Sequence, residues 1–101
     1  MKSLFFCLSF LPSLAFAADM NCGGDVTVVM GDHPSCQGHM AFKTKSSGAK
    51  WMCTKSKEAG SIVLTALTAK KNTGVFINNT DANSCSELPQ YRTISYVMIY
   101  P

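Results

Sequence analysis

The fold class is decided by residues 56–71, SKEAGSIVLTALTAKK, because the hydrophobic period changes here from two residues to three or four. The apolar positions with this spacing are Ala59, Ile62, Val63, Ala66 and Leu67. Such spacing is typical of an amphipathic helix. Thr54 or Ser56 can cap its start, and residues 72–74 (NTG) supply a stop signal. The sequence therefore predicts one helix over residues 56–71.

Strands are predicted on both sides of this helix, three before it and two after it. The clearest of them alternate apolar and polar residues, as in an antiparallel sheet with one solvated face. The five predicted strands are Asp25–Met30, His39–Lys45, Lys50–Cys53, Val75–Ile77 and Thr93–Tyr100. The chain is thus mostly β with one helix, and its order β-β-β-α-β-β is that of a five-stranded OB-fold barrel. Residues 78–92 are interpreted as a long polar connection.

The last predicted strand is apolar on both faces. One face carries Ile94, Tyr96, Met98 and Tyr100, and the other carries Val97 and Ile99. A strand of this kind needs a cover on each side in a small protein. We expect that cover to be the predicted helix or a neighbouring subunit.

The first 17 residues, MKSLFFCLSFLPSLAFA, have the pattern of a cleaved signal peptide. Lys2 gives a positive start, an apolar run follows, and Ala15-Phe16-Ala17 is the small-x-small pattern that signal peptidase recognises. The apolar run is shorter than a membrane-spanning helix and contains Pro12. We therefore expect a single OB-like domain over residues 18–101, secreted or periplasmic, with no membrane span. The short positive start suggests a bacterial signal.

Charge and cysteine content limit the function classes. The net charge of +3 includes Lys2, and a value this small argues against nucleic acid as a partner. Cys7 lies in the predicted signal, so four of the five cysteines remain: Cys22, Cys36, Cys53 and Cys85. In an exported chain these predict two disulfides, and the sequence allows three pairings.

A metal site is the alternative use of two of these cysteines. Thiolates and imidazoles suit zinc, and the candidate ligands are Cys22, His33, Cys36 and His39. Oxidation would remove the thiolates, so we favour disulfides with two loop histidines and expect no metal and no cofactor.

Little in the chain suggests an enzyme. Asp32, Ser35 and a histidine lie close in sequence, but neighbouring residues rarely converge as a catalytic triad does. No phosphate-binding loop, HExxH motif or pair of carboxylates at helical spacing is present. Trp51 is interpreted as a core or rim anchor. We expect no catalytic residues.

The second half of the chain resembles a known group of exported proteins. The segments concerned are WMC (51–53), the helical stretch 55–74, VFINN (75–79), Cys85 and ISYVMIYP (94–101). They are similar to the B subunits of subtilase cytotoxin, typhoid and pertussis-like bacterial toxins and to their short stand-alone relatives. The resemblance implies an OB barrel, a pentameric ring, binding to sialylated host glycans and, in the toxins, a catalytic A subunit. It also implies a disulfide between Cys53 and Cys85, which leaves Cys22 to pair with Cys36.

The glycan pocket of that family cannot be matched here residue by residue. Polar groups beside an aromatic residue give the candidates instead: Asn78, Asn79, Tyr91 and Arg92. Arg92 could pair with a carboxylate and Tyr91 could stack on a sugar face. The alternative is a solvated loop with one tyrosine against the barrel. The sequon formed by residues 78–80 is interpreted as a polar turn.

These observations predict a non-catalytic binding module for a glycan or host surface. It is expected to form a homo-oligomer, with the helix 56–71 or the strand 93–100 in the interface. The alternative is a monomeric exported inhibitor or a structural domain stabilised by disulfides.

Overall fold

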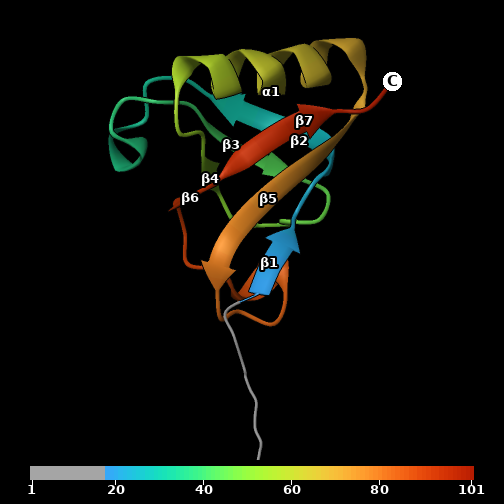
Figure 1. Ribbon diagram of the computed structural model, residues 1–101. Coiled ribbons are helices and arrows are strands. Elements are labelled where there is room, and N and C mark those ends of the chain that lie inside the picture. Colours follow the sequence, from blue (N-terminus) through green and yellow to red (C-terminus); the bar gives the residue numbers. More distant parts are fainter. Residues whose placement is uncertain (1–17) are drawn as a thin grey trace, which may run out of the picture.

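The computed structural model describes residues 18–101, and the predicted signal peptide, Met1–Ala17, lies outside the described residues. A curled, barrel-like sheet is crossed at one end by a single helix (Figure 1). The elements are β1 (Ala18–Asn21), β2 (Gly24–Met30), β3 (Ala41–Thr44), β4 (Met52–Cys53), α1 (Lys57–Ala69), β5 (Asn72–Thr80), β6 (Arg92–Thr93) and β7 (Tyr96–Ile99). Single 3-10 turns occur at Pro34–Cys36 and Cys85–Glu87. The prediction of a mostly β chain with one helix is confirmed.

The pairing of the strands curls the sheet. β2, β3 and β4 form an antiparallel series, and β4 then pairs with β6 in parallel. On the other side, β5 pairs with β1, β2 and β7, all antiparallel. Because β6 and β7 are consecutive, the C-terminal segment joins the β4 side of the sheet to the β5 side.

The prediction of five strands was wrong, because residues 18–101 form seven. β1 had no counterpart in the sequence analysis, and the predicted strand 93–100 is divided into β6 and β7. The division has a physical cause: the Ile94 N–H donates to the carbonyl of Cys53, whereas the Ser95 N–H donates to that of Phe76. The chain therefore changes neighbours from β4 to β5 at this point. As a result Ile94 is buried, while Tyr96 faces solvent.

The helix is confirmed, with Ser56 as its N-cap. The Ser56 hydroxyl accepts a hydrogen bond of 3.1 Å from the Ala59 N–H. The predicted stop at residues 72–74 was wrong, because those residues belong to β5. The helix instead ends at Lys70, whose φ of 56° is left-handed, and the Lys71 N–H closes the end on the carbonyl of Ala66.

The core lies between α1 and the inner face of the sheet. The largest of its fully buried side chains are Phe42, Met52, Ile77, Leu88, Ile94, Val63 and Val75. Phe42 of β3 lies opposite Met52 of β4, so the middle of this sheet faces the core. Val63 and Ala66 present the buried face of the helix to these residues.

The structure corrects the disulfide pairing that the resemblance implied. Cys22 bonds to Cys85 and Cys36 bonds to Cys53, with Cα atoms 5.8 and 5.2 Å apart. Topology accounts for this: the turn that carries Cys36 folds over β4 beside Cys53. Cys22 follows β1 on the flank of β5, where the connection after β5 returns with Cys85.

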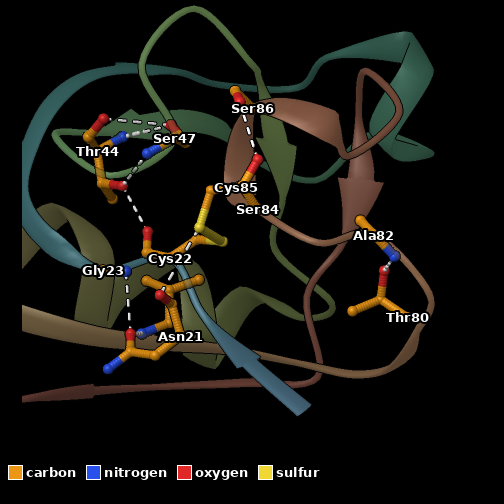
Figure 2. The surroundings of a disulfide bond; sticks show 11 residues. Asn21, Cys22, Gly23, Thr44, Ser47, Thr80, Ala82, Ser84, Cys85 and Ser86 are labelled. Carbon is orange, nitrogen blue, oxygen red and sulfur yellow. Dashed lines mark hydrogen bonds between the residues drawn. A yellow bond between two sulfur atoms is a disulfide. The ribbon is translucent and has the colours of Figure 1, made fainter. Parts of the chain in front are cut away.

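Polar groups fix the chain around the Cys22–Cys85 disulfide (Figure 2). The Asn21 side-chain oxygen accepts from the Gly23 N–H at 3.0 Å and the Val75 N–H at 3.1 Å. The Thr44 hydroxyl donates to the carbonyl of Cys22, which ties β3 to the same corner. Two disulfides fit an oxidising, extracellular environment. Within residues 18–101, no helix combines the length and apolar character needed to cross a membrane.

Candidate functional site

The outer face of β2, β3 and β4 carries the candidate site. Residues paired across antiparallel strands share a face, and Met30 pairs with Ala41, Ala41 with Cys53, and Val28 with Lys43. Since Phe42 and Met52 point into the core, alternation turns their neighbours outward, including Trp51. Val28 and Met30 are 38% and 40% exposed. This face is therefore apolar and partly open to solvent.

A small second core lies under this outer face. Cys36, Ala41 and Cys53 are buried together, and Trp51 and Tyr91 pack against them. The Cys36–Cys53 disulfide is the centre of this cluster and fastens the β2–β3 connection to β4. The two aromatic rings therefore rest on a cross-linked base.

Three rings and one cation form a stack, which we call the aromatic platform: Lys43, Trp51, Tyr91 and His33. The ring centroids of His33 and Tyr91 are 4.5 Å apart, with 27° between the planes. Trp51 and Tyr91 are nearly parallel, at 8°, with centroids 6.4 Å apart. Such a separation is that of an offset stack, and all three rings are half-buried. The Lys43 ammonium lies 4.7 Å from the centroid of the Trp51 ring.

Backbone hydrogen bonds hold the platform in place. The Tyr91 N–H donates to the carbonyl of Trp51 at 2.8 Å, and the Trp51 N–H donates to Gln90 Oε1 at 2.8 Å. Tyr91 itself has a φ of 61°, an uncommon left-handed conformation for a tyrosine. On the other side, His33 Nδ1 accepts from the Ser35 N–H at 3.0 Å, which orients the imidazole. The ring positions are thus set by the backbone of three separate segments.

The four predicted glycan residues have different environments. Tyr91 belongs to the aromatic platform. Arg92 donates from Nη2 to the carbonyl of Asn78 at 3.0 Å, so the structure brings these two together but directs the guanidinium to the backbone. The Asn78 side-chain Oδ1 is buried and has no hydrogen-bond partner among the described residues. Asn79 lies in β5.

Sequence reasoning missed three platform residues, namely Lys43, Trp51 and His33. From the sequence, Trp51 is expected to be an anchor and His33 a loop histidine, and nothing in the spacing places either beside Tyr91. The usable signal was strand alternation, which turns both Lys43 and Trp51 to the outer face. The position of His33 depends on the Cys36–Cys53 disulfide, which the resemblance had paired differently.

The predicted alternative, a zinc site, has no free thiolate ligands in the structure. Cys22 and Cys36 are both in disulfides, so of the four candidate ligands only the histidines keep a free donor atom. Within the described part of the chain, no group of three or more His, Cys, Asp or Glu side chains is placed to hold a metal ion. Of the residues that could be written as a triad, His33 Nδ1 is engaged by a backbone N–H rather than by Asp32.

Comparison of the chain with models of protein families, with curated proteins and with solved structures finds no match in any of the three.

Proposed function

We propose that this protein is an exported, non-catalytic module that binds a carbohydrate on the aromatic platform. The observation that carries the proposal is the offset stack of Trp51, Tyr91 and His33 on an outer sheet face, with the Lys43 ammonium over the Trp51 ring. Sugars present flat C–H faces that pack on aromatic rings, and their hydroxyls hydrogen-bond to polar groups at the edge. Lys43 supplies such a group and would also favour an acidic sugar such as sialic acid.

The sheet topology supports the same location. We assign the fold to a variant of the OB barrel, in which β2, β3, β4, β5 and the β6–β7 segment correspond to its five strands and α1 lies between the third and fourth. OB folds bind oligosaccharides and oligonucleotides on their second and third strands and on the two adjacent loops. Here those strands are β3 and β4, and the loops carry His33 and Tyr91. On this assignment, the platform would lie where the fold class binds ligands, which supports the proposal.

Charge favours a carbohydrate over a nucleic acid. Binding to a phosphate backbone requires several free cations along a groove. The platform contains one lysine, and the neighbouring Arg92 is engaged by the Asn78 carbonyl. A single cation is sufficient for a sugar carboxylate but provides little affinity for a chain of phosphates.

Trp51 makes the proposal testable, because it is the only tryptophan in the chain. A panel of sialylated and neutral oligosaccharides, titrated against the oxidised protein, should change its fluorescence. Tyr91→Asn, chosen because asparagine tolerates the left-handed backbone, should weaken binding about tenfold, equivalent to about 1.4 kcal/mol. Lys71→Ala removes an exposed cation just beyond the end of α1, outside the platform and the β7 surface, and should leave binding unchanged. A response to single-stranded oligonucleotides alone, lost steeply with salt, would contradict the proposal.

Self-association through β7 is the second part of the proposal. Tyr96, Met98 and Tyr100 are 47%, 39% and 39% exposed, and the Tyr96 ring stacks on Phe76 with centroids 4.8 Å apart. Within residues 18–101, β7 pairs only with β5, so its other edge has no strand partner there, next to this apolar surface. A second copy of the chain would cover both. Light scattering should show an oligomer that Tyr96→Ser with Met98→Ser weakens, and a monomer at all concentrations would rule it out.

A further inference from the structure

A separate cavity of about 350 Å³ lies between α1 and the connection from β2 to β3. Its lining comes from the start of the helix, from the end of β4 and from both ends of the connection. The same connection carries His33 of the aromatic platform, so the cavity and the platform flank one loop. A volume at the low end of the range for ligand sites suits a single sugar residue or a group of that size.

The apolar part of the cavity lining, which we call its floor, includes a glycine inside the helix. Met40, Gly60 and Leu64 provide the apolar lining. A Cβ on Gly60 would lie 3.7 Å from the Met40 Cβ and 3.8 Å from the Thr54 hydroxyl, which are ordinary contact distances. Packing therefore does not require glycine here, although glycine is less favourable than alanine inside a helix. The missing side chain instead leaves the space of one methyl group beside Met40 and Thr54 in the cavity lining.

The walls carry opposite charges. Asp32 lies on the connection, with a left-handed φ of 53°, and Lys57 lies in the first turn of α1. The Ser61 hydroxyl donates to the Lys57 carbonyl at 3.2 Å and can still accept or share a hydrogen bond at the rim. Among residues 18–101, the hydrogen bonds and ion pairs of the structure leave the Asp32 carboxylate and the Lys57 ammonium available to a ligand.

From this arrangement we propose that the cavity binds the acetamido group of an N-acetylated hexosamine residue. The inference rests on the proposed carbohydrate function and adds a ligand class to it. An acetamido group combines a methyl group, an N–H donor and a C=O acceptor. The methyl group packs on Met40 and Leu64, the N–H donates to the Asp32 carboxylate, and the carbonyl accepts from the Lys57 ammonium. A plain hexose offers no methyl group to the floor.

Two disaccharides that differ in the acetamido groups provide the test. The oxidised, ¹⁵N-labelled protein is titrated with N,N′-diacetylchitobiose and with cellobiose, and the amide signals are followed by NMR. Both sugars should shift signals at the platform, whereas only diacetylchitobiose should shift those of Gly31, Gly38, Gly60 and Leu64. Platform shifts without cavity shifts, or equal cavity shifts with both sugars, overturn the inference and leave the proposed function standing. Cavity shifts without platform shifts support the cavity and overturn the platform. No shift with either sugar overturns the inference, whereas the proposed function is decided by the separate titration with sialylated oligosaccharides.

Variants separate recognition from folding. Asp32→Asn keeps a residue that tolerates the left-handed backbone and should weaken diacetylchitobiose about tenfold, with cellobiose unchanged. Gly60→Ala fills part of the floor and should weaken the same ligand while leaving the melting temperature equal or higher. Asp81→Asn, an exposed carboxylate elsewhere, is the matched control for charge. Unchanged diacetylchitobiose affinity in both Asp32→Asn and Gly60→Ala would overturn the inference.

Discussion

Removal of the Cys36–Cys53 disulfide should both destabilise the domain and disorder the aromatic platform. The bridge closes a loop with a sequence separation of 17, and that of the Cys22–Cys85 bridge is 63. In the chain-entropy model these loops contribute about 3 and about 4 kcal/mol to the free energy of unfolding. Cys36→Ala with Cys53→Ala should therefore lower stability by about 3 kcal/mol. For a domain of this size the melting temperature should fall by about 12 to 24 °C.

The position of the bridge adds an effect that loop length does not predict. Trp51 and Tyr91 pack on the buried Cys36–Cys53 cluster, whereas the Cys22–Cys85 bridge joins the main core. We expect the first double variant to change the emission of Trp51 in the folded state and to weaken sugar binding. Cys22→Ala with Cys85→Ala should lose about 4 kcal/mol and keep the native emission spectrum.

A mismatched double variant provides the control. Cys53→Ala with Cys85→Ala removes one cysteine from each bridge, so both cross-links should be lost, at a combined cost of about 7 kcal/mol. That is a large part of the stability of an ordinary small domain. Urea unfolding followed by Trp51 fluorescence, with a count of free thiols, distinguishes the three variants. The reasoning fails if the mismatched variant is as stable as the matched ones and binds sugar like the parent protein.

Three further predictions concern particular residues. Combined digestion after Lys and Arg and before Asp, without reduction, should release two disulfide-linked peptide pairs. The first is DMNCGG (19–24) with DANSCSELPQYR (81–92), and the second is DHPSCQGHMAFK (32–43) with WMCTK (51–55). A WMCTK–DANSCSELPQYR species in the mass spectrum would contradict the structure. Gly23→Ala should unfold the domain at markedly lower urea than Gly31→Ala, since a Cβ on Gly23 would lie 2.1 Å from the Thr73 carbonyl oxygen and one on Gly31 meets nothing within 4 Å; equal midpoints would refute this. Ser56→Ala should cost about 1 kcal/mol in the same assay, because the Ala59 N–H loses its cap, and a loss below a few tenths would show that the cap is dispensable.

The sequence predicted those elements whose residues follow a regular hydrophobic period. The three- and four-residue period of residues 56–71 predicted the helix. Thr54 and Ser56 were its two possible caps, and Ser56 is the one used. Alternation predicted β2 and β3. The end of the helix was missed because Lys70, rather than a glycine, adopts the left-handed conformation that closes it. A left-handed conformation is uncommon for lysine. Here it turns the chain from α1 into β5, which begins two residues later.

Features that depend on tertiary contacts were harder to predict from the sequence. The division of the last strand depends on two backbone hydrogen bonds, to Cys53 and to Phe76, that are distant in sequence. Disulfide pairing depends on which loops meet, and a resemblance limited to the second half of the chain could not place Cys22 or Cys36. The candidate site shares this difficulty. Of its residues only Tyr91 was identified, because a tyrosine beside polar loop residues stands out in the sequence, whereas its neighbours belong to other segments.

The Cys36–Cys53 bridge makes the geometry of the candidate site depend on an oxidising environment. His33 lies three residues before Cys36, and Trp51 lies two residues before Cys53, so one disulfide brings both rings to Tyr91. In a reducing compartment the β2–β3 connection would lose this link, and bringing the rings together would again cost loop-closure entropy. We therefore expect the platform to form only after oxidation. Under the proposed function, the chain would acquire this surface in the oxidising compartment to which it is exported.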